Sequence, residues 1–479
     1  MHRSEKSWDE VRAAFKQIWG YEEFRPPQGE IVRSLLSGKD ALVVMPTGGG
    51  KSICFQLPAL LQNGLTLVVS PLVALMENQV QELRQRGLPA ALLHSELPSF
   101  ERKQTLYKIE QQKLRLLYLS PETLLSAPVW EMISQPQIKI NGIILDEAHC
   151  LVQWGDTFRP AYRRLGTVRS ALLKFKPAGS LIAIAAFTAT ADPVAQKTIR
   201  DVLQLQQPDL FKLNPYRPNL RLKVQRVCTP RSRRQQLLKF IQDRPNKSGL
   251  IYVRTRKDSE SLAAWLSKLG YATAAYHAGL SPEERREIEA FWLNGKMQFV
   301  VCTSAFGMGI NKPDVRWVIH FHAPLLLSEY VQEIGRAGRD GNAADACTLV
   351  SEPTGWLDPE DKQRRQYFEN AMRSQQQKAQ KLAKKLPKTG EVNAVARQFS
   401  DGAIALSLLH STGQLTWQDP FHYIIDNTAK MQTSHQLNAA QQMVDYLNTR
   451  ECRWQYLLRA FGFGLEAEKM RCGCCDRCK

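Results

Sequence analysis

Residues 45–52 read Met45-Pro46-Thr47-Gly48-Gly49-Gly50-Lys51-Ser52. Three successive glycines allow backbone N–H groups to close around phosphate oxygens, and Lys51 would lie between the β- and γ-phosphates of a nucleotide. The hydroxyl of Ser52 would hold Mg²⁺, and a helix opening at Ile53 would direct its positive dipole end toward the phosphates. Met45 stands in the place of a usual first glycine. The stretch predicts a phosphate-binding loop between a buried strand and a helix.

An acidic pair follows a second apolar run. Asp146 and Glu147 come directly after residues 143–145, which are Ile-Ile-Leu, and precede Ala148 and His149. Both carboxylates would emerge at the carboxyl end of a strand, beside the phosphate loop. Phosphate hydrolysis needs one carboxylate to hold Mg²⁺ and another to orient and deprotonate water; Asp146 suits the first role and Glu147 the second. The alternative to a nucleotide site is a glycine-rich turn and an unrelated acidic pair on the surface. It explains neither the position of the acidic pair after an apolar run nor the flanking Ala148 and His149.

Short apolar runs alternate with amphipathic segments over residues 1–207, the pattern of a parallel sheet covered by helices. The runs that predict strands are Ala41–Met45, Thr66–Ser70, Leu116–Ser120, Gly142–Leu145 and Leu181–Thr188. Each ends at a small or polar residue or just before the acidic pair, and open α/β sheets bind their ligands at the carboxyl ends of strands. We expect an α/β lobe.

A loop rich in Pro and Asn at residues 214–219 interrupts this pattern, which then resumes. Strands are expected at Gly249–Val253, Ala272–Tyr276, Gln298–Cys302 and Trp317–His320, and helices over Leu262–Leu269 and Pro282–Leu293. Residues 208–350 contain no Gly-Lys-Ser loop. We therefore expect a second α/β lobe that contributes to the nucleotide of the first.

The composition, with 43% hydrophobic and 23% charged residues among 479, is that of a soluble globular protein of two or three domains. An excess of 64 Lys and Arg over 46 Asp and Glu gives a net charge of +18. This excess favours a nucleic-acid backbone as partner, and a basic surface that only aids solubility is the alternative. No apolar run is long enough to span a bilayer, and residues 1–6 lack the apolar core of a signal peptide. We expect a cytoplasmic protein without a membrane partner.

The sheet pattern stops near Ser351, and we assign residues 351–479 to a mostly helical region. Residues 360–388 predict a basic helix. Residues 391–426 show two short helical periods, a turn and two strand-like runs. That order is typical of a small winged helix, and an ordinary helical linker is an equally weighted alternative.

Five cysteines gather near the end of the sequence: Cys452, Cys472, Cys474, Cys475 and Cys478. In a chain without an export signal, such clustering favours a metal over disulfides, with a redox cluster as the alternative. Zinc takes four tetrahedral ligands. Adjacent Cys474 and Cys475 cannot easily both bind one ion, so one cysteine is spare.

The sequence around the acidic pair resembles a known family. Residues 146–150 continue as Leu151-Val152-Gln153-Trp154-Gly155, followed by Phe158-Arg159-Pro160 and Tyr162. This run resembles the DEAH box and the aromatic-rich loop of RecQ-family DNA helicases in superfamily 2. The resemblance extends through nearly all of residues 10–345. It implies two tandem RecA-like lobes, with ATP and Mg²⁺ as cofactors and single-stranded and forked duplex DNA as partners.

Further motifs match in the family's order. They are Gly20-Tyr21, Phe24-Arg25-Pro26 and Gln28; Ser70-Pro71-Leu72, Leu75-Met76 and Gln79; Phe187–Ala191; Ala305–Pro313; and Gln332–Gly341. The resemblance implies that Gln28 reads adenine, that Tyr21 and Arg25 contact the nucleotide, and that Gln332 belongs to the nucleotide-binding set together with Thr47, Gly48, Gly49, Gly50, Lys51 and Ser52.

Arg336 and Arg339 are three residues apart, so they would share one face if their segment were helical. From the second lobe they would reach the γ-phosphate as arginine fingers, which are worth ~10³–10⁵ in rate where measured. The adjacent Gly335 and Gly338 favour this role over the alternative, which is contact with DNA phosphates.

The resemblance implies that the loop after the acidic pair senses single-stranded DNA and couples it to hydrolysis. The residues we assign to this coupling are His149, Trp154, Phe158 and Arg159. Aromatic side chains near a basic one stack unpaired bases at ~1–3 kcal/mol each. Burial of Trp154 and Phe158 in a core is the alternative.

In the family's zinc pattern a Cys precedes Arg, and a Cys-Gly-x-Cys-Asp-x-Cys run follows after a gap. Cys452, Cys472, Cys475 and Cys478 match this pattern, and Cys474 falls on the variable position. The resemblance implies a structural Zn²⁺ that holds the C-terminal helices on the second lobe.

The sequence departs from the family after the zinc motif. Family members commonly carry a winged helix and a further helical domain there, whereas this sequence stops one residue after Cys478. We therefore assign the family's strand-separating hairpin to no residues of this sequence. Residues 391–426 are the candidate for an inserted domain.

The function we expect is an ATP-dependent helicase that moves 3′ to 5′ on single-stranded DNA in repair or recombination. It would be a monomer, associated with the nucleoid if bacterial, with a single-stranded-DNA-binding protein as a candidate partner. The alternatives are a DNA-stimulated translocase or annealing factor with weak unwinding, an RNA-directed member of the superfamily, and a non-enzymatic DNA-binding scaffold.

Overall fold

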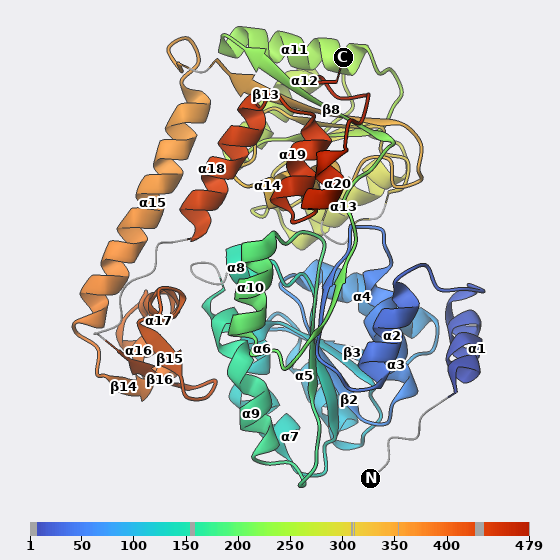
Figure 1. Cartoon of the computed structure of the whole chain (residues 1–479), viewed down its shortest axis with the longest axis vertical. Helices are drawn as coiled ribbons and strands as arrows, with labels where there is room; N and C mark the ends of the chain where they lie inside the picture. Colours follow the sequence, from blue (N-terminus) through green and yellow to red (C-terminus); the bar gives the residue numbers. More distant parts are fainter. Residues whose placement is uncertain are drawn as a thin grey trace. The chain divides into compact units, whose positions relative to one another are not determined.

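The computed structural model describes residues 7–153, 159–307, 310, 312–352, 354–426 and 435–478. The chain folds as two units, one formed by residues 1–213 with 375–434 and the other by residues 214–374 with 435–479. Each unit contains a parallel sheet covered by helices (Figure 1). The expected pair of RecA-like lobes is confirmed.

The first unit is built on a seven-stranded parallel sheet of order β3-β4-β2-β5-β6-β1-β7. Its strands are β1 (Ala41–Val44), β2 (Leu65–Val69), β3 (Ala90–Leu93), β4 (Leu116–Leu119), β5 (Ile140–Leu145), β6 (Ala183–Thr188) and β7 (Asp209–Lys212). The first six are buried along their whole length, as expected for a parallel sheet covered on both faces.

Helices lie on both faces of this sheet. They are α1 (Trp8–Trp19), α2 (Gln28–Leu36), α3 (Lys51–Leu61), α4 (Val73–Gln85), α5 (Ser99–Glu110), α6 (Pro121–Leu124), α7 (Ala127–Ser134), α8 (Cys150–Gln153), the 3₁₀ helix η1 (Pro160–Thr167), α9 (Val168–Leu173) and α10 (Pro193–Val202). Because side chains alternate along a strand, Val43 packs with α2, α3 and α4, whereas Val44 packs with α7, η1, α9 and α10.

All five strands expected in the first lobe are present, with ends that differ by no more than two residues. The short strands β3 and β7 escaped prediction. The edge strand β7 leaves Leu210 46% exposed, so its four residues do not form the continuous apolar run of a buried strand. It pairs with β1, and the sheet therefore continues beyond residue 207.

The second unit contains a six-stranded parallel sheet of order β10-β11-β9-β12-β13-β8. Its strands are β8 (Leu220–Val227), β9 (Gly249–Tyr252), β10 (Ala275–Tyr276), β11 (Phe299–Cys302), β12 (Trp317–His320) and β13 (Ala344–Ser351). Its helices are α11 (Pro230–Gln242), α12 (Arg256–Lys268), α13 (Pro282–Leu293), α14 (Leu327–Ile334), the first part of α15 (Glu360–Ala383), α18 (His435–Asn448), α19 (Arg453–Ala460) and α20 (Gly464–Glu468).

The expected elements of the second lobe are confirmed, and α13 has the predicted bounds because Ser281 and Glu284 form a capping box at its start. The strands β8 and β13 were missed. In β8, buried and exposed residues alternate in its first half, which is the pattern of an edge strand. Helices α11 and α12 pack on one face of the sheet, and α14, α18 and α19 pack on the other.

A small module follows α15 in the first unit (Figure 1). It consists of β14 (Thr389–Glu391), α16 (Val392–Gln398), α17 (Gly402–Ser411), β15 (Leu415–Trp417) and β16 (His422–Ile425). The strands form an antiparallel sheet of order β14-β16-β15 with its own apolar core. The end of α15 followed by strand, helix, helix and hairpin gives the element order of a winged helix, and we call this part the inserted module.

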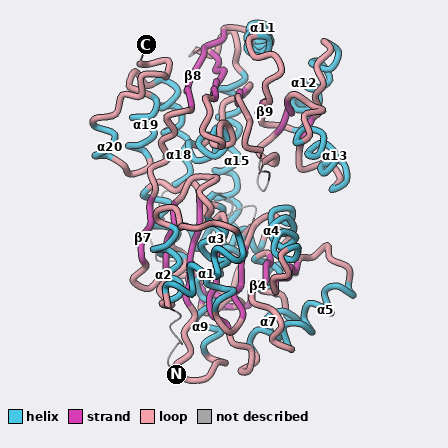
Figure 2. The backbone as a smooth tube through the Cα atoms, turned by 90° about the vertical axis from the view of Figure 1, so that its right-hand side faces the viewer, coloured by secondary structure: helices cyan, strands magenta, loops and turns pink. Residues whose placement is uncertain are grey.

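The strands, magenta in Figure 2, form the interior of the first unit, and helices surround them. None of the described helices has the length and apolarity needed to cross a membrane.

Candidate nucleotide, DNA-coupling and zinc sites

The phosphate loop connects the buried strand β1 to α3, which begins at Lys51. Gly50 has a φ of +77°, and a Cβ there would lie 2.4 Å from Nε2 of Gln28, so both the backbone conformation and the space require glycine. Nζ of Lys51 donates to the backbone oxygen of Met45 at 3.0 Å. The loop is thus folded around its own lysine, with its N–H groups at the first turn of a helix.

Gln28 connects the N-terminal motif to this loop. Its Nε2 donates to the backbone oxygen of Gly49 at 3.0 Å, and its Oε1 accepts the backbone N–H of Arg25 at 3.0 Å. Tyr21 is 52% exposed, and its ring lies 5.8 Å from that of Phe15. The predicted adenine-reading residue therefore lies beside the phosphate loop, with an exposed aromatic ring in the same motif.

Asp146 and Glu147 follow β5 and are both buried. One carboxylate oxygen of Asp146 accepts Nε2 of Gln79 at 3.1 Å, and the other accepts the backbone N–H of Glu147 at 3.0 Å. Since β5, β6 and β1 are neighbours in the sheet, their carboxyl ends place the acidic pair, Thr188 and the phosphate loop along one edge. This is the juxtaposition that the two motifs predicted.

Two structural features of the acidic pair could not be predicted from its sequence motif. Glu147 adopts a left-handed φ of 51°, which is uncommon and costly for a residue with a side chain and is typical of functional sites. His149 lies between the pair and β6, because its Nδ1 is 3.1 Å from Oγ1 of Thr188 and 3.2 Å from Oε2 of Glu147. Gln79 thus contacts Asp146 directly, and Thr188 contacts His149, which lies beside Glu147. Both Gln79 and Thr188 belong to motifs that the sequence had marked without assigning this role.

The pKa of Asp146 is raised to about 6, first by burial and then by the neighbouring charge of Glu147, while Lys51 lowers it. A divalent cation at this carboxylate would oppose both effects and favour its ionised form. The carboxylate pair and Ser52 form a donor set of hard oxygens that suits Mg²⁺.

The predicted DNA-coupling loop is only partly described. Trp154 and Phe158 lie outside the described residues. Arg159 follows them, and its Nη1 is 2.6 Å from a carboxylate oxygen of Glu122 in the first turn of α6. His149, from the same predicted set, contacts the acidic pair as described above.

In the second unit, Arg336 and Arg339 follow the end of α14 at Ile334 and lie in turns. They are therefore not neighbours on a helix. They nevertheless meet the same loop, because Nη1 of Arg336 donates to the oxygen of Gly307 and Nη1 of Arg339 donates to that of Ile310 at 3.1 Å. A side chain at Gly307 would collide with the Arg336 guanidinium.

This loop is the expected Ala305–Pro313 motif, of which Met308, Gly309 and Asn311 lie outside the described residues. Gln332 is partly exposed on α14. The next residue, Glu333, forms two hydrogen bonds with Arg254 at 3.0 and 2.8 Å and lies 3.0 Å from Nε2 of His320. Burial opposes ionisation of Glu333, but Arg254 and His320 outweigh it and lower the pKa to about 2, so this network fixes α14 on the sheet.

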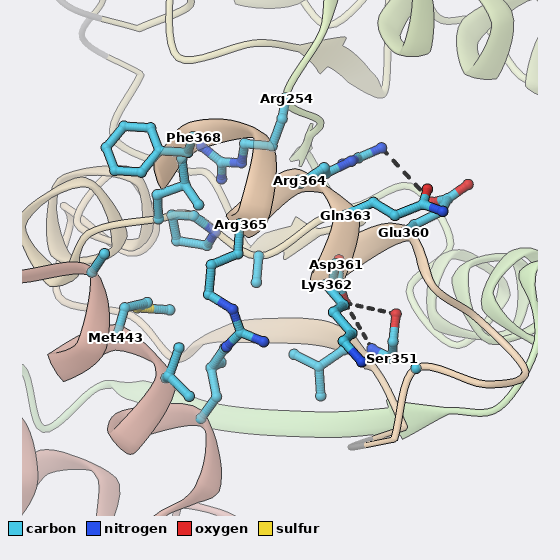
Figure 3. Close-up of a pocket in the computed structure, with 18 of the residues that line it drawn as sticks. Arg254, Ser351, Glu360, Asp361, Lys362, Gln363, Arg364, Arg365, Phe368 and Met443 are labelled. Atoms are coloured by element: carbon cyan, nitrogen blue, oxygen red, sulfur yellow. Dashed lines mark hydrogen bonds and ion pairs between the residues drawn. The ribbon is translucent and has the colours of Figure 1, made fainter. Parts of the chain in front are cut away.

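A cavity of about 790 Å³ opens in the second unit at the carboxyl ends of β8, β9, β12 and β13, lined by the first half of α15 and the second half of α18. Arg365 extends from α15 into it, with Phe368 and Met443 on one side and Lys362 on the other (Figure 3). Nearby Arg364 is paired with Asp258 at 3.2 Å. Among the described carboxylates none pairs with Lys362 or Arg365, which leaves the cavity basic with an apolar wall.

The thiols of Cys452, Cys472, Cys475 and Cys478 lie within 4.8 Å of one another. Sγ of Cys475 is 4.0 Å from that of Cys452 and 3.6 Å from that of Cys478. Zinc–sulfur bonds of 2.3 Å in a tetrahedron place the sulfurs about 3.8 Å apart, so the cluster fits Zn²⁺. Cys474 is the spare residue, as expected.

The cysteine cluster is tied to the sheet of the second unit. Arg453 forms two hydrogen bonds to Asp476 at 2.9 Å each. The backbone N–H of Asp476 donates to the oxygen of Leu222 in β8 at 3.1 Å, and Nε1 of Trp454 donates to that of Leu220 at 3.2 Å. The C-terminal helices are therefore held on the second lobe beside the metal ligands.

Comparison with known families matches three stretches of the chain. Residues 25–198 match the DEAD/DEAH box helicase family, residues 232–341 match the helicase conserved C-terminal domain, and residues 419–479 match the RecQ zinc-binding family. Over 471 residues the chain is 54% identical to ATP-dependent DNA helicase RecQ of Synechocystis sp., which covers 98% of both sequences. The chain belongs to the RecQ family of helicases. Residues 342–418 of this RecQ-family chain fall between the second and third matches.

Other members of the RecQ family are longer. The chain is 41% identical over 342 residues to ATP-dependent DNA helicase RecQ of Pasteurella multocida, which covers 71% of this chain and 52% of that relative. It thus spans about half the length of the Pasteurella protein.

Solved structures confirm the fold of the RecQ-family chain. Dbp5 of S. cerevisiae bound to RNA and ADP BeF3 aligns with a TM-score of 0.58 at 17% identity, over 74% of this chain and 91% of that one. Helicase Lhr of Mycobacterium smegmatis, bound to ssDNA and AMP-PNP, aligns with a TM-score of 0.57 at 18% identity, over 91% of this chain and 61% of that one. At these identities the likeness concerns the fold alone.

Proposed function

We propose that this chain is an ATP-dependent DNA helicase that moves 3′ to 5′ along single-stranded DNA and opens duplexes during repair or recombination. The observation that carries the proposal is the buried Asp146–Glu147 pair at the same sheet edge as the Lys51 loop, in a chain of the RecQ family. The direction of movement is the family's.

The chemical roles follow from the positions of the side chains. Bound Mg²⁺ would neutralise charge on the transferred phosphate, and Ser52 and Asp146 are the residues that would hold it. Lys51 would neutralise the β- and γ-phosphates. Glu147 would orient the attacking water and accept its proton, and Gln79 and His149 keep the acidic pair in place.

We assign Arg336 and Arg339 as the arginine fingers that stabilise the transition state from the second unit. Hydrolysis would then require both units, which connects ATP turnover to movement along a strand. The Arg254–Glu333–His320 network supports this assignment because it fixes the helix that precedes both arginines.

The DNA contacts we propose use both units. The net charge of +18 and the basic cavity around Lys362 and Arg365 support a path for a single-stranded backbone, and Phe368 offers a surface for a base. The loop from Trp154 to Arg159 would couple the bound strand to hydrolysis. The same proposal includes forked duplexes as substrates and a single-stranded-DNA-binding protein as a partner. It also includes association with the nucleoid.

Zinc has a structural role in this proposal. When bound, Zn²⁺ would cross-link Cys452 to the three terminal ligands, and the contacts of Arg453 and Trp454 would transmit that constraint to β8. No catalytic step passes through this site.

The proposal is tested by ATP hydrolysis with no nucleic acid, single-stranded DNA, duplex DNA or RNA, beside unwinding of a 3′-tailed duplex. A helicase hydrolyses ATP when single-stranded DNA is present and displaces the strand, and Lys51→Ala abolishes both activities. Stimulation without displacement identifies the translocase alternative. If DNA binds but never stimulates hydrolysis, the scaffold alternative holds and the proposal fails.

A further inference from the structure

The inserted module has the topology of a DNA-binding domain but an apolar second helix. In helix-turn-helix domains the second helix of the motif enters the major groove, and α17 occupies that place. Its sequence, residues 402–411, reads GAIALSLLHS and contains no Lys or Arg. Gly402 and the five residues from Ala405 to Leu409 are buried. A phosphate-facing helix would instead carry basic side chains on an exposed surface.

Part of what covers α17 is the helicase lobe itself, because α17 packs against η1. His410, near the end of α17, is largely buried, and burial followed by the charge of Arg163 lowers its pKa to about 3. His410 is therefore neutral at ordinary pH. The helix that would otherwise read DNA contributes to an interface within the first unit.

The hairpin between β15 and β16, which is the wing in such domains, also contacts the lobe. The ring of Phe421 lies 5.1 Å from that of Trp130 in α7, at an interplanar angle of 81°. Nη1 of Arg164 in η1 donates to the backbone oxygen of Pro420 at 3.1 Å. Both surfaces with which a winged helix contacts DNA are therefore occupied by protein.

This interface lies next to the proposed DNA-coupling loop. The helix η1 begins at Pro160, directly after Arg159, and Arg159 pairs with Glu122 at 2.6 Å. Burial lowers the pKa of Arg164 to about 10, and the same Glu122 raises it. Glu122 thus pairs with the end of the coupling loop, and its charge also acts on the arginine that binds the wing.

We propose that the inserted module is an internal brace that positions the end of the DNA-coupling loop, with Arg164 and Phe421 as its positioning residues. In this state the wing is not a strand separator and α17 does not read DNA. The proposal rests on the proposed function, since it assigns the brace to the coupling of single-stranded DNA to hydrolysis.

The test compares Phe421→Ala with Ile424→Ala in the full chain. Ile424 lies three residues further along, on the exposed side of β16, and is 37% exposed, so its truncation removes an apolar side chain that does not face the lobe. Phe421→Ala is expected to raise the single-stranded DNA concentration for half-maximal stimulation of ATP hydrolysis several-fold. Hydrolysis without DNA, and all properties of Ile424→Ala, are expected to match the parent protein.

Arg164 gives a second measurement that does not depend on the aromatic contact. Arg164→Ala is expected to reproduce the stimulation defect, and Arg164→Lys to recover most of it, because an ammonium can donate to the oxygen of Pro420. A merely structural role would lower thermal stability and DNA-free hydrolysis together, so both are measured for each variant.

The outcomes separate this proposal from the proposed function. Should the parent protein show no DNA stimulation, the proposed function fails. Normal stimulation in both Phe421→Ala and Arg164→Ala would overturn the brace alone. Tighter DNA binding by Phe421→Ala with unchanged stimulation would overturn it too, since the module would then be a DNA-binding domain held back by its contact with the lobe.

Discussion

The two lobes share a parallel sheet but use it differently. In the first, the carboxyl ends of β1, β5 and β6 carry the lysine loop, the acidic pair and the threonine that contacts His149. In the second, arginines after α14 donate to a neighbouring loop, and one face of the sheet supports the helices of the cysteine cluster. One architecture thus carries the lysine loop and acidic pair in one lobe and the arginines and cysteine cluster in the other, and the difference resides in loops rather than in the sheet.

The largest loss of ATP hydrolysis is expected when the arginines of the second lobe are replaced, and it would test this contrast between the lobes. Arg339→Ala and Arg336→Ala should each lower kcat for ATP hydrolysis by about 10³-fold or more, with a smaller change in KM for ATP, because an arginine finger acts mainly on the transition state. Steady-state kinetics with saturating single-stranded DNA measures this split.

Arg459→Ala is the control for these arginines. Arg459 is an exposed arginine of the same unit, paired with Glu451 at 2.9 Å, and its loss should cost at most about 1 kcal/mol of stability and leave kcat unchanged. A variant of Arg336 or Arg339 that weakens DNA binding but keeps kcat would assign these residues to DNA phosphates instead.

The next effect concerns the metal cross-link of the second lobe. Cys475→Ser should lose bound zinc and destabilise the second unit by about several kcal/mol, since ligand binding and folding are coupled at structural zinc sites. Cys474→Ser, one residue away, should keep one equivalent of zinc. Metal analysis and thermal unfolding of both variants decide the ligand set, and retention of zinc by a stable Cys475→Ser protein would refute it.

A smaller effect is expected at the base-reading side of the first lobe. Gln28→Ala should reduce the preference for ATP over GTP by about 1–3 kcal/mol, the value of a paired contact between an amide and a base edge. The ratio of kcat/KM for the two nucleotides measures this. Tyr21→Ala is the comparison, because loss of its ring should weaken both nucleotides alike. An unchanged ratio in Gln28→Ala would remove the residue from base recognition.

The smallest effect concerns pH and the carboxylate of Asp146. With a pKa raised to about 6, Asp146 is ionised above that value and gains a proton as the pH falls through it. Below about pH 6, the Mg²⁺ concentration for half-maximal hydrolysis should therefore rise about tenfold per pH unit. Saturating Mg²⁺ should restore most of the rate, and a Mg²⁺ requirement that is constant down to about pH 5 would contradict this assignment.

Most of the strands that the sequence predicted are buried along their whole length, because a continuous apolar run records burial on both faces, although the buried strand β3 was missed as well. The edge strands β7 and β8 were missed, since partial exposure at an edge mixes polar residues into the run. Similarly, Lys51 and Asp146 could be found from residue types and spacing, whereas the choice of Cys475 over Cys474 as a zinc ligand came from the resemblance to the RecQ family. Gln79 and Thr188 lie far from Asp146 and His149 in sequence, so their contacts could not be derived from spacing.

By itself, the sequence determined the chemistry of the phosphate loop and the acidic pair and the order of two α/β lobes, because each depends on residue types and local patterns. The four zinc ligands followed from the family pattern that the sequence resembles. Only the tertiary structure decided the left-handed backbone at Glu147, the non-helical setting of Arg336 and Arg339, and the packing of α17 and Phe421 on the first lobe. These features arise from contacts between segments distant in the chain, and their free energy depends on three-dimensional packing that no local pattern records.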